Sequence, residues 1–193
     1  MLHLVLGGAR SGKSSFSEKW LLSQLKNANQ SATYIATAQA LDDEMQQRIK
    51  YHRQQRTSEQ WQVKECPLRL SELLTELDDN QFVLIDCLTL WLTNQLMLEI
   101  DRHQDETLIA EHLSEKINSL VKAAQKSSAT IVCVANEVGL GVVPMGVESR
   151  IFVDHAGWLN QKLAKIAEKV TLVTAGLPLT LKSSNAIEGN KRG

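Results

Sequence analysis

Short apolar runs alternate along this chain with longer segments in which apolar residues recur at helical spacing. The runs are rich in β-branched and aliphatic residues, each is too short for a buried helix, and polar or glycine turns follow them. They predict strands at 2–6, 32–37, 82–86, 130–135 and 170–174. The intervening segments predict helices at 15–26, 42–56, 105–126 and 157–169.

Strands that alternate with helices indicate crossover connections and a mainly parallel sheet with helices on both faces. We expect a single α/β domain over residues 1–182, followed by a polar tail at 183–193. In such sheets ligands bind beyond the carboxyl ends of the strands. This places the segment 7–14, Thr37, Asp86, and Asn136 with Glu137 in one crevice.

The segment after the first predicted strand matches the phosphate-binding pattern G-x-x-x-x-G-K-[ST] in full. It consists of Gly7, Gly8, Ala9, Arg10, Ser11, Gly12, Lys13 and Ser14. Glycines let successive backbone N–H groups point at phosphate oxygens, and the following helix adds its positive dipole end. We expect Lys13 to reach the β- and γ-phosphates of ATP or GTP, and the Ser14 hydroxyl to ligate Mg²⁺. A plain glycine turn is the alternative, but the strand–loop–helix setting argues against it. The motif predicts a P-loop, RecA-like fold.

Asp86 ends the apolar run 82–86. P-loop proteins use a carboxylate in this position to hold Mg²⁺, directly or through water. An aspartate after a strand is also a common turn or helix-capping residue. Because the chain carries a P-loop, we favour Asp86 as the second Mg²⁺ residue.

Composition excludes several classes of protein. Lys plus Arg number 21 against 22 for Asp plus Glu, so the basic surplus of a nucleic-acid-binding protein is absent. No signal peptide or membrane span is predicted, and the three cysteines follow no disulfide or zinc pattern. We expect a cytoplasmic protein with reduced, buried cysteines.

The predicted helix 42–56 carries an apolar stripe that gives way to His52, Arg53 and Arg56 towards its end. A solvated helix terminus whose cations match the dipole is one interpretation. The other is functional, because arginines suit a polyphosphate and a histidine beside them can act as a general base or a phosphorus nucleophile.

Other polar residues are less informative. We expect His3 and His112 to be structural or exposed, His103 to lie in a polar loop at 101–105, and His155 to serve packing or to face solvent. Glu137 is a candidate base for a kinase step or a second Mg²⁺ anchor, and a plain turn is nearly as good an interpretation.

Several segments together resemble the bifunctional adenosylcobinamide kinase/adenosylcobinamide-phosphate guanylyltransferase family. They are the P-loop 7–14, the run 34–39, Asp42 to Met45, Arg48-Ile49, His52-Arg53, Arg56, Trp61, the stretch 136–144, Arg150, Asp154, Ala156-Gly157 and 159–161.

The resemblance implies two reactions. A nucleoside triphosphate phosphorylates the aminopropanol hydroxyl of adenosylcobinamide, and GTP then transfers GMP to that phosphate, giving adenosylcobinamide-GDP for cobalamin biosynthesis. It also implies that a histidine carries the GMP covalently, and the matching position is His52, with Lys13 as the other catalytic residue. The nucleotide-binding residues implied by the match are 7–14, Ala36, Thr37, Ala38, Arg53, Gln54, Gln55, Arg56, Glu65 and Asp86. Mg²⁺ and a homo-oligomer, specifically a trimer, are implied as well.

Two rival functions remain at this point. One is a P-loop NTPase that works as a motor or switch, in which His52 is only structural. The other is a simple small-molecule kinase without guanylyl transfer. No base-reading residue decides between ATP and GTP for the kinase step.

Overall fold

The computed structural model describes residues 1–27, 30–39 and 60–183, and its centre is a seven-stranded sheet in the order β3-β2-β4-β5-β1-β6-β7. The strands are β1 (Leu2–Gly7), β2 (Ala32–Ala36), β3 (Trp61–Glu65), β4 (Phe82–Asp86), β5 (Thr130–Asn136), β6 (Lys169–Thr174) and β7 (Leu177–Lys182). Six strands run parallel, and only β7 is antiparallel, to β6. The predicted mainly parallel α/β sheet is confirmed.

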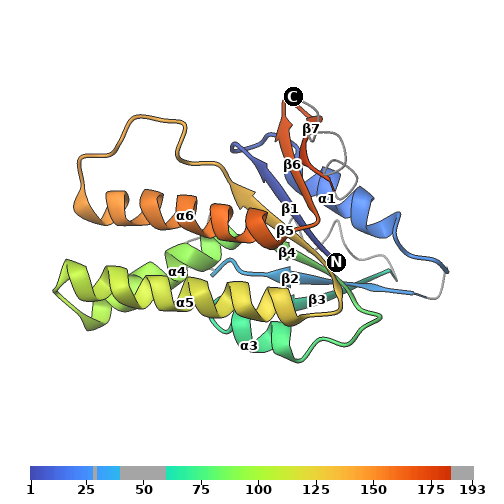
Figure 1. The fold of residues 1–193 in the computed structure, drawn as a ribbon, viewed down its shortest axis with the longest axis horizontal. Coiled ribbons are helices and arrows are strands. Elements are labelled where there is room, and N and C mark those ends of the chain that lie inside the picture. Colours follow the sequence, from blue (N-terminus) through green and yellow to red (C-terminus); the bar gives the residue numbers. More distant parts are fainter. Residues whose placement is uncertain (28–29, 40–59, 184–193) are drawn as a thin grey trace, which may run out of the picture.

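Helices cover both faces of this sheet (Figure 1). On one face lies α1 (Lys13–Leu22), which contacts β1, β4, β5 and β6. The other face carries α3 (Leu70–Thr75), α4 (Leu88–Arg102), α5 (Glu106–Lys126) and α6 (Val147–Ile166), which pack on one another. Within the described ranges, no helix is both long and apolar enough to cross a membrane.

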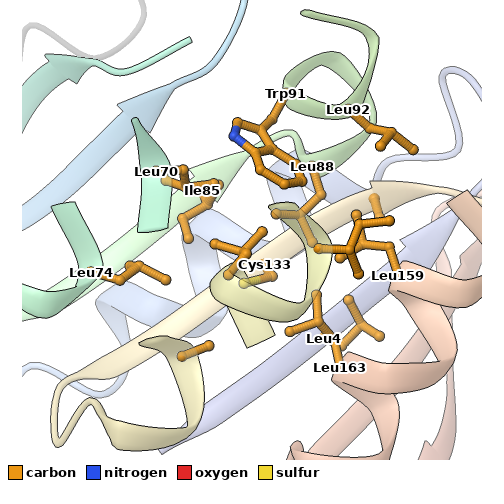
Figure 2. Close-up of a cluster of buried hydrophobic side chains, with 14 of the residues drawn as sticks. Leu4, Leu70, Leu74, Ile85, Leu88, Trp91, Leu92, Cys133, Leu159 and Leu163 are labelled. Atoms are coloured by element: carbon orange, nitrogen blue, oxygen red, sulfur yellow. The ribbon is translucent and has the colours of Figure 1, made fainter. Parts of the chain in front are cut away.

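The core follows from the alternation of side chains along β1, which sends neighbouring residues to opposite faces. Leu4 belongs to the large cluster under α3 to α6, whereas Val5 belongs to a smaller cluster with Leu21 of α1. Figure 2 shows part of the large cluster, where Leu4, Ile85 and Cys133 of the sheet meet leucines of the covering helices. The sheet is therefore buried on both faces at its centre, as a parallel sheet requires.

The structure corrects two predicted helices and adds elements that the pattern did not indicate. The helix predicted at 15–26 runs from Lys13 to Leu22. The helix predicted at 157–169 runs instead from Val147 to Ile166, after Gly146 as its N-cap, and residues 169–174 form β6. The added elements are β3, β7, α3 and α4. The predicted helix 42–56 lies outside the described residues, and so does the tail from 184, so the domain boundary at 182 stays a prediction.

Candidate nucleotide-binding site

The predicted P-loop forms the connection between β1 and α1, with Gly12 as the N-cap of the helix. Gly12 has φ of 93°, a left-handed conformation that costs glycine little. At Gly7 a Cβ atom would lie 2.5 Å from the backbone oxygen of Val173, so this position leaves no room for a side chain. The pattern thus requires glycine at position 12 for conformational reasons and at position 7 for steric reasons.

Two backbone hydrogen bonds hold the loop from outside. The N–H of Gly176, in the β6–β7 turn, donates to the oxygen of Ser11 over 2.9 Å. The N–H of Glu137, which follows β5, donates to the oxygen of Gly7 over 3.1 Å. The loop is therefore fixed at both ends by the strands that flank β1 in the sheet.

Lys13 is buried, with 8% of its surface exposed, and its Nζ donates to the oxygen of Gly8 over 2.8 Å. Burial lowers the pKa of the Lys13 ammonium, while Cys87 and Asp86 act in the opposite direction. An ammonium held at the mouth of the loop with little water around it has a strong electrostatic attraction for a polyphosphate. The lysine is thus positioned beside the loop that it is expected to serve.

Asp86 lies at the carboxyl end of β4, in register with Ala36 of β2 and Val134 of β5. The Tyr34 hydroxyl donates to Asp86 Oδ2 over 3.1 Å. The charge of Asp86 opposes the lowering of the Lys13 pKa by burial, although β5 lies between β1 and β4 in the sheet. The hydroxyl of Ser14, half-buried in the first turn of α1, supplies a second oxygen. Oxygen donors of this kind are those that Mg²⁺ prefers.

Thr37 follows β2 and is fully buried. Its hydroxyl accepts from the N–H of Cys87 over 2.9 Å and donates to the oxygen of Cys87 over 2.7 Å. The side-chain amide of Asn94, on α4, donates to the oxygen of Thr37 over 2.8 Å. Thr37 thus ties the ends of β2 and β4 together, and its half-buried neighbours Ala36 and Ala38 border the same edge of the sheet.

Glu65 ends β3 in register with Ala36. It is exposed, and it lines a surface hollow together with Cys66, Pro67 and Leu68. Glu65 therefore stands at the same edge as the P-loop, with three strands between β3 and β1.

Glu137 is a turn residue by its contacts, because its carboxylate accepts from the N–H of Gly139 over 2.8 Å. Its backbone nevertheless touches the P-loop at Gly7, so the side chain lies at the border of the site. The two interpretations of this residue from the sequence, turn and catalytic group, are compatible with one another.

Two of the five histidines serve packing, as expected. His3 is buried, bonds Thr171 Oγ1 over 2.9 Å and stacks edge-on against Trp20. The ring nitrogens of His155 contact the oxygens of Ile151 and Ala110 at 2.7 and 3.0 Å. The expectation for the cysteines is also confirmed, because Cys66, Cys87 and Cys133 are free and buried.

The structure thus brings the P-loop, Lys13, Asp86 and the ends of β2 and β3 to one edge of the sheet. Five predicted site residues lie outside the described residues: His52, Arg53, Gln54, Gln55 and Arg56. Three supporting residues escaped the sequence analysis, namely Tyr34, Asn94 and Gly176. Of these, Gly176 offered a signal, because an isolated glycine between two short apolar runs indicates a turn.

Comparisons with known proteins cover nearly the whole chain. A family model described as cobinamide kinase / cobinamide phosphate guanyltransferase (CobU) matches residues 3–181. The bifunctional adenosylcobalamin biosynthesis protein CobP of Pseudomonas aeruginosa is 42% identical over 183 residues, covering 94% of this chain and 98% of the relative. The bifunctional adenosylcobalamin biosynthesis proteins CobU of Escherichia coli and Salmonella typhimurium are 41% and 40% identical over 187 residues, covering 94% of this chain and 100% of each relative. By both comparisons, the chain belongs to the cobinamide kinase / cobinamide phosphate guanyltransferase family.

Proposed function

We propose that this protein phosphorylates adenosylcobinamide with ATP or GTP and then transfers GMP from GTP to the resulting phosphate. The products of the second step are adenosylcobinamide-GDP and pyrophosphate. Membership of the family supports the pair of reactions. The observation that carries the nucleotide half of the proposal is the buried Lys13 ammonium at the P-loop, within electrostatic reach of Asp86.

The P-loop holds the phosphates in both reactions. Backbone N–H groups of residues 7–14 and the Lys13 ammonium bind the oxygens on which negative charge gathers as a phosphoryl or pyrophosphate group leaves. The hydrogen bond from Lys13 to Gly8 keeps the ammonium at the loop before a nucleotide arrives. Less reorganisation is then needed when the nucleotide binds.

The Ser14 hydroxyl and the Asp86 carboxylate would hold Mg²⁺. Bound there, Mg²⁺ neutralises phosphate charge during transfer. Tyr34 supports this role, because its hydroxyl bond to Oδ2 orients the Asp86 carboxylate. Outer-sphere partners of this kind fix the geometry of metal ligands.

His52 is the proposed nucleophile for guanylyl transfer. The neutral imidazole attacks the α-phosphorus of GTP, a P–N bond forms, and the bond from that phosphorus to the bridging oxygen of pyrophosphate breaks. The phosphate of the corrinoid substrate then attacks the same phosphorus and displaces the imidazole. Arg53 and Arg56 would neutralise the charge that develops.

The remaining nucleotide contacts are proposed at the ends of β2 and β3. Ala36 and Ala38 offer backbone groups beside the sheet edge, and Thr37 keeps them in place through its bonds to Cys87. Glu65 offers a carboxylate that can accept from the amino and imino groups of a guanine. Gln54 and Gln55 complete the set.

The test is incubation of the protein with Mg²⁺ and GTP labelled in the α-phosphate. We expect an acid-labile label on the protein, absent from His52→Ala, while His52→Ala still phosphorylates adenosylcobinamide. Lys13→Ala should lower both activities by about 10²–10³-fold, the usual cost of losing a charge-stabilising donor. If the wild-type protein takes up no label, it does not transfer GMP and is a simple kinase or an NTPase. Release of phosphate in the absence of any corrinoid would then identify it as an NTPase.

Assembly and compartment belong to the same proposal. Large apolar side chains are exposed on the loop between β5 and α6 and on β7: Leu140, Val142, Val143, Met145, Leu177, Leu179 and Leu181. Exposed apolar groups in such numbers favour a subunit contact. We propose a cytoplasmic homo-oligomer, and light scattering after gel filtration tests for the trimer.

A further inference from the structure

A cluster of one carboxylate and two imidazoles lies at the C-terminal end of α4, apart from the nucleotide site. Glu99 contributes the carboxylate from α4, His103 the imidazole that follows the helix, and His112 the imidazole from α5. The metal-ligating atoms of the three residues lie within 4.8 Å of one another. From the sequence alone, His112 is expected to be structural or exposed within a helix, and His103 is expected to lie in a polar loop.

Both imidazoles face the same oxygen of the carboxylate. Glu99 Oε2 lies 2.8 Å from His112 Nδ1 and 3.5 Å from His103 Nε2. Donors bound at about 2.0–2.1 Å to a tetrahedral Zn²⁺ are separated by about 3.4 Å, so the spacing needs only small side-chain rotations. The two rings meet edge-on, with centroids 4.9 Å apart.

The backbone builds this convergence. The N–H of His103 donates to the oxygen of Glu99 over 2.9 Å, which closes the last turn of α4 and places the His103 ring above Glu99. Asp105 then caps α5 by accepting from the N–H of Thr107, and α5 packs against α4. His112 follows Asp105 by about two turns of α5, which places its ring beside Glu99.

Burial makes the carboxylate unusual. The Glu99 side chain is only 3% exposed, whereas those of His103 and His112 are 28% and 38% exposed. Buried carboxylates are costly unless charge or hydrogen bonds compensate them. Arg102 supplies part of this compensation, but its Nη1 lies 3.5 Å from Oε1, the other oxygen. Oε2 is instead contacted by two imidazoles whose side chains are partly exposed to solvent.

We infer that Glu99, His103 and His112 form a binding site for a divalent transition-metal ion of the zinc class. Two imidazoles and one carboxylate are borderline ligands that suit Zn²⁺, Co²⁺ or Ni²⁺ better than Mg²⁺. Three protein ligands leave one position for water, so the ion exchanges with solvent. Bound there, the ion links the end of α4 to α5.

The site is distinct from the proposed Mg²⁺ site. Glu99 lies eleven residues beyond Leu88, the first residue of α4, which is about 17 Å along the helix axis. Leu88 in turn directly follows the segment that contains Asp86 and Cys87. The three native thiols are buried away from solvent. Burial also raises the pKa of each, which disfavours the thiolate form that binds Zn²⁺.

The experiment is titration of the tag-free, chelator-treated full chain with Zn²⁺ alone, without nucleotide, by calorimetry. Metal analysis after dialysis gives the stoichiometry. We expect one equivalent in the wild type and an affinity at least about tenfold lower in His103→Ala, His112→Ala and Glu99→Gln, since even outer-sphere changes cost about 10–100-fold. Zn²⁺ should also raise the Tm of the wild type but not of the histidine variants. Co²⁺ should give the intense visible absorption of a four-coordinate ion.

Two controls make the result decisive. Glu111→Gln alters an exposed carboxylate next to His112 and should bind Zn²⁺ as the wild type does. His52→Ala should do the same, which separates this site from the proposed catalytic histidine. The histidine variants change half-exposed side chains, and their circular dichroism without metal verifies that they fold. Absence of saturable Zn²⁺ uptake, or uptake that survives both His103→Ala and His112→Ala, overturns the inference.

Discussion

The backbone N–H of Gly176 donates a hydrogen bond to the oxygen of Ser11, and the Cα of Gly176 lies 3.2 Å from the place where a Cβ of Gly12 would be. The turn between β6 and β7 therefore lies directly against the P-loop. This contact joins residues more than 160 positions apart, and it fixes the loop from the side opposite to β5. The shape of the phosphate-binding loop depends on the hairpin as well as on its own glycines.

Gly12→Ala is expected to disturb the P-loop in two ways. Alanine at φ of 93° is strained by about 1–3 kcal/mol, and its Cβ meets the backbone of Gly176. The variant should have a lower Tm and weaker nucleotide binding, measured by thermal unfolding with and without GTP. Gly157→Ala is the matched control, because nothing lies within 4 Å of a Cβ there and alanine favours the interior of α6. Equal stability of the two variants would contradict the prediction.

Tyr34→Phe is expected to raise the Mg²⁺ concentration needed for half-maximal kinase activity by about tenfold. Phenylalanine keeps the ring in the core but removes the hydroxyl that bonds Asp86 Oδ2. Asp86→Asn, which removes the charge itself, should have a larger effect in the same assay. If Tyr34→Phe changes the maximal rate but not the Mg²⁺ requirement, the hydroxyl does not act through the metal ligand.

Thr37→Val should destabilise the fold by about 1–3 kcal/mol, because the buried N–H of Cys87 loses its acceptor. Valine has nearly the same shape, so little of the loss comes from packing. Urea unfolding measures the change. Thr33→Val, in β2 and half-buried, is the control and should stay close to the wild type. If Thr37→Val unfolds at the same urea concentration as the wild type, Thr37 does not join β2 to β4.

Acid should destabilise the protein partly through His3. Burial, and to a lesser extent Lys169, lowers the pKa of His3 to about 4 from the model-peptide value of 6.5. Between pH 6.5 and about 4 the unfolded chain binds a proton at this residue and the native protein does not. The free energy of unfolding therefore falls with decreasing pH by about 1.4 kcal/mol per pH unit from this residue alone.

His3→Phe removes that contribution while keeping an aromatic ring against Trp20. Between pH 6.5 and about 4, the free energy of unfolding of this variant should change less with pH than that of the wild type. The difference between the two slopes should be up to about 1.4 kcal/mol per pH unit. Carboxylates contribute equally to both proteins, so the difference between the two slopes isolates His3. Parallel slopes would mean that His3 is protonated in the native state.

The central strands and the P-loop were predictable because each depends on local sequence. A parallel strand buried on both faces is a continuous apolar run, and β1, β4 and β5 are such runs. The glycines at positions 7 and 12 are required by a close contact and by a left-handed φ, so the motif reports the geometry directly.

The missed elements depend on tertiary packing. Helix α4 lies between the sheet and the outer helices, and its broad buried side contains the polar residues Asn94, Gln95 and Glu99 as well as apolar ones. Its apolar residues alone therefore form no clear stripe in the sequence. Strand β7 contains Pro178, which is tolerated only because β7 is the last strand of the sheet. The roles of Asn94 and Tyr34 arise from contacts between positions more than 50 residues apart, which spacing in the sequence cannot reveal.

The reversed direction of β7 offers a place for chemical labelling. Lys182, its last residue, pairs with Val170 at the start of β6, so the strand ends at the edge of the sheet remote from the phosphate loop. Thr180, near that end of the strand, is exposed and is not among the apolar residues of the proposed subunit contact. Cys66, Cys87 and Cys133 are buried, and burial raises the pKa of each thiol. A single cysteine introduced at position 180 would react selectively with maleimides. A dye or surface linker attached there would leave the nucleotide edge open to solution.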